Sequence, residues 1–380
     1  MKATLVKILG ALLKRLAQAT IWRYRPGIVA ITGSAGKTSA KLAVGAVLSA
    51  ERSVRYARGN FNNELGVPLA ILGDYEKIKG VFFWPRVILR AFWNLVATVD
   101  YPDILILEYG VDHPGDMKYL IGIARPNVSI VTGIGNIPPH VEFFKDPETL
   151  AREKVRIIEC LPEGGYAVLN ADNELTMDYR DRTRANVLTY GFDKNANVQL
   201  SGFEYFFRGS EPQGIKFNVS YGGTTVPIEL DGAFGRPQAY AVGAAFAVGF
   251  IFGMTFQKMI SALRRYRPAE HRLSLQPGMK PETYVIDDSY NASPLSMAAA
   301  LETLNALPAK RRVAVLGDML ELGKYAIPAH EALGAQVAKA ANVLITVGTR
   351  AKFIAESARK AGLKRANIYS FDDAEAAIPT

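Results

Sequence analysis

One segment near the N-terminus constrains the fold more than any other part of the sequence. Residues 28–40 read IVAITGSAGKTSA, an apolar β-forming run followed by a glycine-containing loop and a helix-forming run. In this order, the loop glycines let backbone N–H groups and the helix N-terminus face phosphate oxygens, as in a P-loop. Ile31 stands where the usual first glycine would be, so the loop is a variant.

The loop supplies the first group of candidate site residues. The predicted nucleotide phosphate-binding residues are Gly33, Ser34, Ala35, Gly36, Lys37, Thr38 and Ser39. Among them, Lys37 is expected to reach the terminal phosphates and the Thr38 hydroxyl to hold Mg²⁺. A P-loop alone does not distinguish a kinase, a GTPase, a motor or a ligase.

The pattern around the loop indicates an α/β fold. Apolar runs at residues 27–32, 103–110 and 128–135 alternate with longer helical runs, which is typical of a parallel sheet flanked by helices. Between about Val198 and Leu230 the runs alternate polar and apolar residues with glycine punctuation. That change indicates an antiparallel insertion or a second sheet.

A domain boundary is predicted near Tyr266-Arg267-Pro268, because a second series of strands and helices follows it. The predicted fold class is therefore a P-loop parallel-sheet ATPase domain with a small antiparallel β portion, followed by a Rossmann-like α/β domain. The predicted divisions are a basic amphipathic helix at 1–25, a central ATP-binding domain at 26–267 and a C-terminal domain at 268–380.

Composition narrows the setting of the protein. The chain has 380 residues, a single cysteine and a formal net charge of +9. One cysteine excludes a disulfide framework and fits a reducing compartment, so the cytoplasm is expected. The charge favours anionic partners. Nucleic acid is not expected among them, because the basic residues are spread along the chain and no recognised binding module accompanies them.

Residues 1–25 form a basic amphipathic segment that has two interpretations. The segment is too short to span a bilayer and no small-residue cleavage site follows it. It either packs on the domain or lies at the membrane surface as a peripheral contact. Residues 81–99, which are rich in Phe and Trp beside Arg86 and Arg90, are open to the same two interpretations.

Four further segments decide between the P-loop classes. These are GNFNNELGVPLAIL, LILEYGVDHPGDM, PPHVEFFKDPETLAREK and VIDDSYNASPLSM. Together with the short TGSAGKT loop they resemble the Mur ligases, and within that family the ligases that add D-alanyl-D-alanine. The resemblance runs from about Gly27 to about Gly348.

The resemblance implies a reaction, cofactors and substrates. Mur ligases use ATP and Mg²⁺ to convert a carboxylate into an acyl phosphate, which an amine then attacks. By resemblance the substrates are a UDP-MurNAc-peptide and D-Ala-D-Ala, in the synthesis of peptidoglycan. The expected protein is a cytoplasmic monomer, with contact to the inner face of the membrane through residues 1–25.

The resemblance also assigns site residues. Glu108 ends an apolar strand, at the edge of the sheet where ligands bind in α/β folds. By resemblance Glu108, His140 and Lys154 are metal ligands together with Thr38, with Lys154 carbamylated; Lys37, His140 and Lys154 are the expected catalytic residues. The other implied residues are Arg272, Asp288 and Asn291 for ATP, and Asn60, Asn62 and Asn63 for the substrate. Asp318 and Glu321 are candidates for the same part of the site as Asp288. Their presence is explained nearly as well if they are ordinary surface residues.

The sequence departs from the family pattern in three places. The P-loop strand begins by residue 27, so the usual N-terminal uridine-binding domain is expected to be lacking. Phe234 and Gln238 stand where the family has His and Asn, so adenine recognition is expected to differ. The chain ends at Thr380 before an expected Lys-Gly-Ser segment, so the C-terminal domain is expected to be incomplete.

Two alternatives stay open on the sequence. One is a Mur-like ligase with a different amino acceptor. The other is a membrane-associated nucleotide-binding protein without ligase activity. Intact Lys37, Thr38, Glu108, His140 and Lys154 argue against the second alternative.

Overall fold

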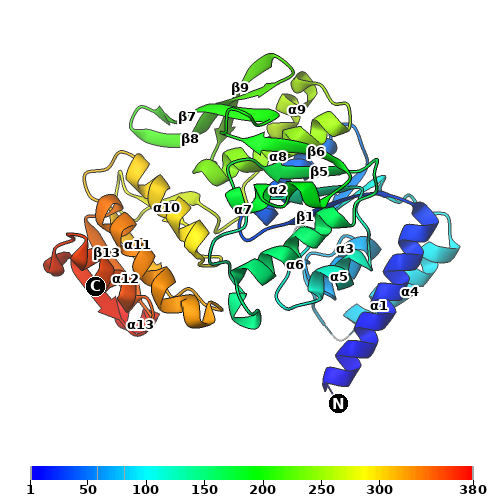
Figure 1. The fold of residues 1–380 in the computed structure, drawn as a ribbon, viewed down its shortest axis with the longest axis horizontal. Helices are drawn as coiled ribbons and strands as arrows, with labels where there is room; N and C mark the ends of the chain where they lie inside the picture. Colours follow the sequence, from blue (N-terminus) through cyan, green and yellow to red (C-terminus); the bar gives the residue numbers. More distant parts are fainter. Residues whose placement is uncertain (1, 58, 81, 379–380) are drawn as a thin grey trace.

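The computed structural model describes residues 2–57, 59–80 and 82–378, and their side chains from residue 6 onward. Its centre is a nine-stranded sheet with the order β2-β3-β1-β4-β5-β6-β7-β8-β9 (Figure 1). The first six strands are β1 Gly27–Thr32, β2 Val54–Tyr56, β3 Ile104–Glu108, β4 Val128–Val131, β5 Tyr166–Asn170 and β6 Asn186–Gly191. All the pairs among these six are parallel, as predicted.

Strand β1 lies between β3 and β4, and this order brings the candidate site residues together. The register pairs Ile31 with Glu108 on one side and with Ile130 on the other, so the carboxyl ends of three strands meet beside the phosphate loop. Alternate residues of β1 face two separate cores, with Ile28 in one and Val29 in the other. A strand buried on both faces explains the nearly continuous apolar run.

Helices cover both faces of this sheet. Helices α2 and α8 pack against each other and share the core of Val29. The opposite core includes residues of α3, α5 and α6. The bounds are α2 Lys37–Leu48, α3 Gly66–Leu72, α5 Asp116–Ile121, α6 Pro147–Glu159, α7 Glu174–Met177, α8 Arg236–Ile251 and α9 Phe256–Leu263.

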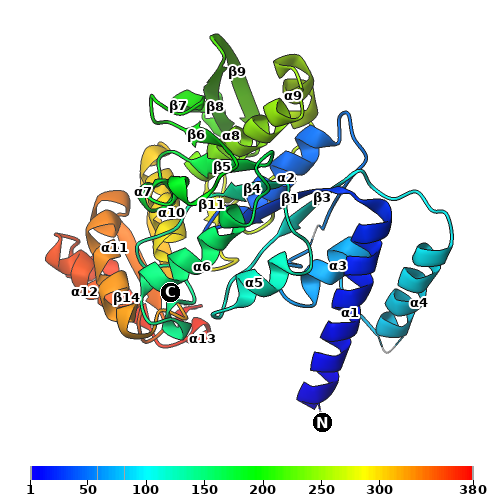
Figure 2. The same ribbon diagram turned by 45° about the vertical axis from the view of Figure 1, so that its right-hand side comes forward.

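The antiparallel portion continues the same sheet. Strands β7 Val198–Arg208, β8 Glu211–Tyr221 and β9 Thr224–Asp231 form a meander, and β7 joins β6 in parallel. The sequence allowed either an antiparallel insertion or a second sheet in this region. The structure has the insertion, because these strands extend the central sheet. The meander lies at the top of the molecule in Figures 1 and 2, beside α8 and α9.

The C-terminal part has its own small sheet. Strands β12 Val313–Gly317, β13 Val343–Val347 and β14 Ile368–Phe371 are parallel, with α10 Pro294–Ala306, α11 Ala326–Ala340, α12 Lys352–Lys360 and α13 Ala374–Ala377 around them. The run TYVIDD at residues 283–288, in the series predicted after residue 268, forms β11, Tyr284–Asp287. It pairs with β10, Ser274–Pro277, in an antiparallel hairpin and does not join the parallel sheet. The turn from Gly278 to Thr283, closed by a backbone hydrogen bond between them, explains this pairing. The domain boundary at residue 268 stays a prediction.

The N-terminal segment forms helix α1, Lys2–Tyr24, which packs on the domain. Leu13, Leu16 and Ala17 are buried against α3 and α4. Helix α4, Phe83–Val96, arises from the second ambiguous segment and buries only Val87 and Ala91. In the described part of the chain, no helix is both long enough and apolar enough to cross a bilayer.

Candidate functional site

The phosphate loop joins β1 to α2 and is held against the end of β4. Gly33 has a φ of +148°, and a Cβ on it would lie 2.1 Å from the Thr132 hydroxyl, so only glycine fits. That hydroxyl donates to the Ala35 carbonyl at 2.6 Å. Gly36 is left-handed and begins α2. The Ser34 hydroxyl is buried without a hydrogen-bond partner in the described structure. An unpaired donor in a loop of this shape fits a phosphate oxygen.

Glu108 lies beside the loop in a buried charged cluster. Its Oε2 is 3.1 Å from Lys41 Nζ and accepts a hydrogen bond from Thr38 Oγ1 at 3.3 Å. Glu108 is 3% exposed and Lys41 1% exposed, so both ends of the pair are out of water. Lys41 also donates a hydrogen bond to the Gly59 carbonyl at 3.1 Å. The cluster therefore contacts the start of the asparagine loop, which is the segment with Asn60, Asn62 and Asn63.

The charges in this cluster compete with burial. Burial would raise the pKa of Glu108, but Lys41 and Lys37 outweigh it and hold the pKa below its ordinary value. The Lys37 pKa is lowered, chiefly by burial, and repulsion from Arg272 adds to the shift. In the described structure Lys37 Nζ donates to the Gly33 carbonyl at 2.9 Å. An anion entering the loop would therefore relieve an excess of positive charge.

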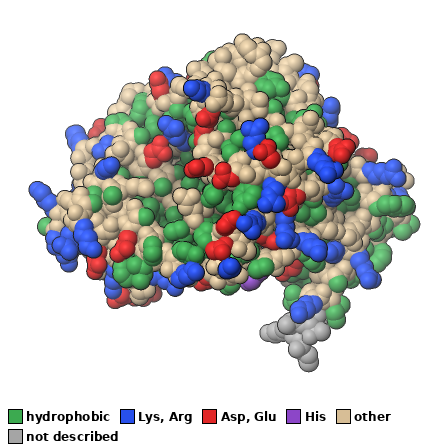
Figure 3. Space-filling view, in the orientation of Figure 1, with side chains coloured by type: hydrophobic (Ala, Val, Ile, Leu, Met, Phe, Trp, Pro, Cys, Tyr) green, Lys and Arg blue, Asp and Glu red, His purple; other side chains and the backbone are tan. Residues whose placement is uncertain are grey.

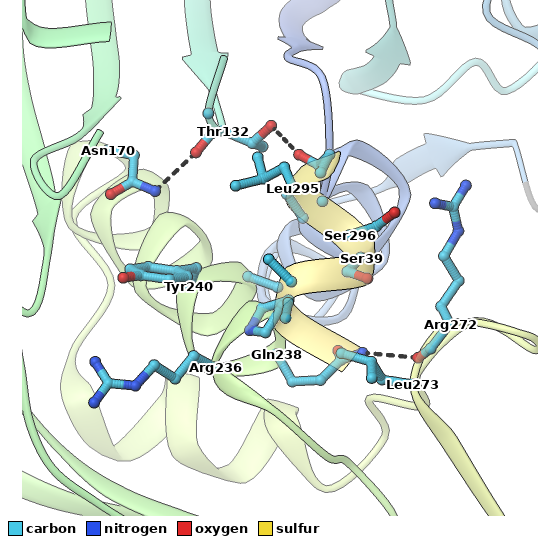
Figure 4. A pocket seen from close by; sticks show the side chains of 18 of the residues that line it. Ser39, Thr132, Asn170, Arg236, Gln238, Tyr240, Arg272, Leu273, Leu295 and Ser296 are labelled. Atoms are coloured by element: carbon cyan, nitrogen blue, oxygen red, sulfur yellow. Dashed lines mark hydrogen bonds between the residues drawn. The ribbon is translucent and has the colours of Figure 1, made fainter. Parts of the chain in front are cut away.

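A cavity of about 480 Å³ opens next to the loop. Its walls come from both parts of the chain, including Ala35, Gly36 and Ser39 on one side and Arg272, Asp288 and Leu295 on another. Figure 4 shows Asn170, Tyr240 and Arg236 on one side of the cavity and Arg272 on the other. A mainly apolar cavity of this kind beside a phosphate loop suits a nucleoside.

Phe234 and Gln238, which stand where the family has His and Asn, have different surroundings in the structure. Phe234 is buried in the core. Gln238 lines the cavity and is 1% exposed. Its Oε1 accepts from the Tyr266 hydroxyl at 2.6 Å, and its Nε2 donates to the Arg272 carbonyl at 3.3 Å. Gln238 thus fixes the segment that carries Arg272.

His140 lies between the two parts of the chain. Its Nε2 is 3.3 Å from Asp112 Oδ1, and its Nδ1 is 2.5 Å from Glu321 Oε2. The second contact lacks hydrogen-bond geometry, since Nδ1 has no hydrogen-bond partner in the described structure. Burial lowers the His140 pKa against the pull of both carboxylates and so favours the neutral ring, which is the form that coordinates cations. Glu321 thus contacts a residue of the N-terminal part, whereas Asp318 accepts hydrogen bonds from the backbone N–H groups of Arg350 and Ala351.

Lys154 is buried on α6. Its side chain is 2% exposed. Burial, reinforced by repulsion from Lys37, lowers its pKa to about 7. Asp112 and Asp116 act in the opposite direction, so Lys154 lies in the same electrostatic neighbourhood as His140. A neutral buried amine is a nucleophile.

The predicted metal ligands are only partly assembled. Thr38 and Glu108 are in direct contact, and His140 and Lys154 each interact electrostatically with Lys37 of the same loop. Among the described residues no group of three or more His, Cys, Asp or Glu side chains is arranged to hold a metal ion. Thr38 and Glu108 nevertheless offer the hard oxygen donors that suit Mg²⁺, which commonly takes one or two protein ligands and completes its shell with phosphates and water.

The residues predicted for the adenosine side are divided. Arg272 and Asp288 line the cavity, and Arg272 lies 4.0 Å from the centre of the Tyr290 ring. Asn291 is exposed and does not line the cavity. Asp288 accepts from the Leu273 backbone N–H at 3.1 Å. Burial raises the Asp288 pKa to about 6, against the effect of that hydrogen bond and of Arg272.

Replacing Asp288 with asparagine is expected to stabilise the protein at neutral pH. The amide oxygen can keep the Leu273 hydrogen bond, while the charge that burial opposes is removed. A carboxyl with a raised pKa costs stability as pH rises from 3.8 to about 6. Asp288→Asn should gain about 1–2 kcal/mol at pH 7 and nothing below pH 3.8. Urea unfolding at both pH values measures this; an equal change at both, or a gain in the exposed Asp178→Asn control, would contradict it.

The asparagine loop follows Gly59 and leads to α3. Asn63 Oδ1 accepts from the backbone of Gly66 at 2.9 Å and of Leu65 at 3.3 Å, so Asn63 shapes the turn. Asn62 packs against Gly110, just after Glu108, where a Cβ would lie 3.0 Å from its side chain. Asn60 is exposed. One asparagine is explained by the turn, and the loop lies at the carboxyl end of β3.

Several site residues were missed on the sequence. Lys41 follows Lys37 by one helical turn in an otherwise apolar helix, which was a usable signal. Thr132 and Asn170 come at the ends of β4 and β5, and Asn170 donates to the Thr132 carbonyl at 2.8 Å. The rule that ligands bind at the carboxyl edge of the sheet would have found both. Nothing local signals Tyr240, whose hydroxyl donates to Asp172 at 2.7 Å.

Comparison with protein families agrees with this geometry. The Mur ligase middle domain matches residues 93–249, and the Mur ligase, glutamate ligase domain matches residues 271–380. A UDP-N-acetylmuramoyl-tripeptide--D-alanyl-D-alanine ligase of Bacillus subtilis is 29% identical over 92% of this chain and 68% of its own length. The same-named ligase of Mycobacterium tuberculosis is 30% identical over 89% of this chain and 62% of its own. The chain thus spans about two thirds of the length of these curated relatives.

Solved structures show the same fold. MurF from Acinetobacter baumannii superimposes with a TM-score of 0.79 at 24% identity, over 97% of this chain and 72% of that one. MurF ligase from Thermotoga maritima in complex with ADP gives a TM-score of 0.74 at 25% identity, over 97% and 81%. With the two family domains matched in their order along the sequence, this chain belongs to the Mur ligase family.

Proposed function

We propose that the protein is an ATP-dependent ligase that joins D-Ala-D-Ala to a UDP-MurNAc-peptide by an amide bond, in the synthesis of peptidoglycan. The observation that carries the proposal is the meeting of the phosphate loop, Glu108 and Lys154 at one edge of the sheet, next to a cavity. The names of relatives at 29–30% identity over most of this chain support the choice of substrates. We expect a cytoplasmic monomer.

The reaction proceeds in two steps. A carboxylate oxygen of the peptide attacks the γ-phosphorus of ATP, which releases ADP and forms an acyl phosphate. The amine of D-Ala-D-Ala then attacks the acyl carbon, loses a proton, and expels inorganic phosphate from the tetrahedral intermediate. The transition state of the first step spreads negative charge over the phosphoryl oxygens, so positioned cations supply most of the catalysis.

Different side chains bind the phosphates, Mg²⁺, the nucleoside and the peptide substrate in this proposal. Lys37 and the loop backbone hold the phosphates, and the unpaired Ser34 hydroxyl donates to one of their oxygens. Mg²⁺ would be held by Thr38 and Glu108, where it would neutralise phosphate charge. Arg272 and Asp288 bound the nucleoside from the C-terminal part. Asn60 and Asn62 serve the peptide substrate.

His140 and Lys154 complete the site. The neutral imidazole of His140 would ligate a second cation together with the carbamate of Lys154. The buried amine of Lys154 can add CO₂ and lose a proton, which yields an N-carboxylate. That change replaces a neutral amine with an anion, which a site crowded by Lys37 and Lys41 would stabilise.

ADP release by the full chain tests the proposed function. Purified protein is given Mg-ATP and UDP-MurNAc-tripeptide, with or without D-Ala-D-Ala. ADP release should require all three substrates. Lys37→Ala is expected to lower the rate at least about 100-fold, because it removes a charge aimed at the transferred phosphoryl group. Lys339→Ala, at an exposed lysine of α11, is the matched control and should leave the rate unchanged.

Each other outcome has a definite meaning. ADP release that ignores the dipeptide but responds to another amine would assign a different acceptor. Nucleotide binding without ADP release under any combination would favour the nucleotide-binding protein without ligase activity. Equal rates in Lys37→Ala and the unaltered chain would contradict the phosphate-loop assignment.

A further inference from the structure

Helix α4 presents an apolar face with no partner in the described structure. Its buried face, centred on Val87 and Ala91, packs toward α1 and α3. The opposite face carries large apolar side chains that are 51–83% exposed: Phe82, Leu89, Phe92, Trp93 and Val96. These residues recur at helical spacing, so they form one stripe along the helix. A contiguous exposed apolar stripe of this kind marks an interaction site.

The charged side chains of α1 and α4 all have one sign. Neither α1 nor α4 contains an aspartate or a glutamate. Arg86 and Arg90 are exposed along the same helix, and Arg15 and Arg23 are exposed on α1. In Figure 3 hydrophobic, Lys and Arg side chains gather at the right-hand end of the molecule, where α1 and α4 lie in Figure 1.

The two helices hold the stripe rigidly. The Tyr24 hydroxyl donates to the Asn94 carbonyl at 2.5 Å, and Arg23 donates to the Ala97 carbonyl at 3.1 Å. Tyr24 also stacks on Tyr101, with ring centres 4.5 Å apart. Trp22, at the end of α1, is 77% exposed. Leu13, Leu16 and Ala17 of α1 are buried, and Trp22 is the one exposed aromatic residue described in that helix, so the exposed aromatic surface belongs mainly to α4.

We propose that α4, with the end of α1, binds the surface of an anionic phospholipid membrane. Aromatic and aliphatic side chains beside arginines, with no acidic residue, are what an interfacial helix needs to insert its apolar face among lipid chains while its cations meet phosphate headgroups. A second copy of the chain is less suitable, because two such faces would bring like charges together. The peripheral contact expected of residues 1–25 is thereby moved to the α4 stripe.

The test uses the full chain and two kinds of vesicle. Cosedimentation compares vesicles of phosphatidylcholine alone with an equimolar mixture of phosphatidylcholine and phosphatidylglycerol. The chain should bind the anionic vesicles preferentially, and added salt should release it. Leu89→Gln with Trp93→Gln should lower the partition coefficient at least about tenfold. Arg86→Gln with Arg90→Gln should lower it on anionic vesicles only.

Matched controls remove equivalent side chains elsewhere. Met279→Gln with Val315→Gln takes away exposed apolar groups of the C-terminal part, and Arg359→Gln with Lys360→Gln takes away exposed charges of α12. Both controls should bind vesicles as the unaltered chain does. Because the positions are exposed, all variants should keep their unfolding temperature and their ATP binding.

Tryptophan fluorescence gives an independent readout. The chain has three tryptophans, and they lie at positions 22, 84 and 93, all in α1 and α4. Their emission should shift to shorter wavelength when anionic vesicles are added. The proposal is overturned if no vesicle is bound, if the stripe and control variants bind equally, or if light scattering shows a dimer that the stripe variants abolish while vesicle binding is absent.

Discussion

Replacing Glu108 with glutamine is expected to lower ADP release about 1000-fold and to destabilise the fold by about 3–5 kcal/mol. Both effects come from the loss of one negative charge. Glutamine keeps the size of the side chain, but Lys41, at 3.1 Å and 1% exposed, is left without its counter-charge. Lys37 loses the attraction that opposes its desolvation. The proposed Mg²⁺ site loses its carboxylate.

A double variant separates stability from activity. Glu108→Leu combined with Lys41→Met replaces the buried ion pair with apolar side chains of similar size. Such a replacement is often neutral or stabilising, so urea unfolding should return to about the unaltered value. ADP release should stay about 1000-fold low, because the oxygen ligand is still missing. Recovery of activity together with stability would contradict a role for Glu108 in the reaction.

An exposed ion pair provides the control. Glu204 and Lys216 are 3.0 Å apart on the antiparallel strands, and both are more than half exposed. Glu204→Gln should change the free energy of unfolding by less than about 1 kcal/mol.

The pH dependence of the Glu108–Lys41 pair gives a second check. The Glu108 pKa is lowered, so the pair's contribution should be complete above pH 4.5, its ordinary value, and be lost as pH falls further.

The site elements that were predictable follow one rule. Glu108 and the phosphate loop could be placed together because the carboxyl ends of neighbouring parallel strands meet at one edge, and the register of β1 with β3 confirms that meeting. The parallel sheet, the antiparallel insertion and the three C-terminal strands were readable for the same reason, since periodicity reports burial. The specific roles of the site residues stay predictions.

The missed features depend on contacts between distant segments. The partner of β11 is set by the turn at Gly278–Thr283, which gives no hydrophobic signal. The approach of Glu321 to His140 depends on how the two parts of the chain meet. The exposure of α4 could not be read either, because an apolar helix face looks the same in sequence whether it meets a core or solvent.

Replacing Lys154 with methionine is expected to lower ADP release about 1000-fold while making the protein more stable. Lys154 is 2% exposed, and burial of its amine lowers its pKa to about 7, so the charged form is disfavoured in the folded protein. Methionine fills a similar space without a buried polar group. A stability gain with an activity loss indicates a residue that serves the reaction at the expense of the fold.

The stability gain should depend on pH in a defined way. The Lys154 pKa is lowered from 10.5 to about 7, so in that interval the unfolded chain binds a proton that the folded chain does not. The unaltered protein therefore loses stability as pH falls from 10.5 to about 7, and the gain from Lys154→Met should grow over this window and then level off. Urea unfolding in CO₂-free buffer measures it, with exposed Lys339→Met as a control that should show no such trend.

Carbon dioxide distinguishes a carbamate from a plain amine. If Lys154 works as its N-carboxylate, removal of CO₂ from the buffer should lower the activity of the unaltered chain, and bicarbonate should restore it. Lys154→Met should respond to neither treatment. In Lys154→Ala, which leaves a space where the lysine side chain was, a small carboxylate such as acetate should recover part of the activity. Activity that is indifferent to CO₂ in the unaltered chain, while Lys154→Met is inactive, would instead assign the neutral amine itself, which a pKa of about 7 makes available at physiological pH.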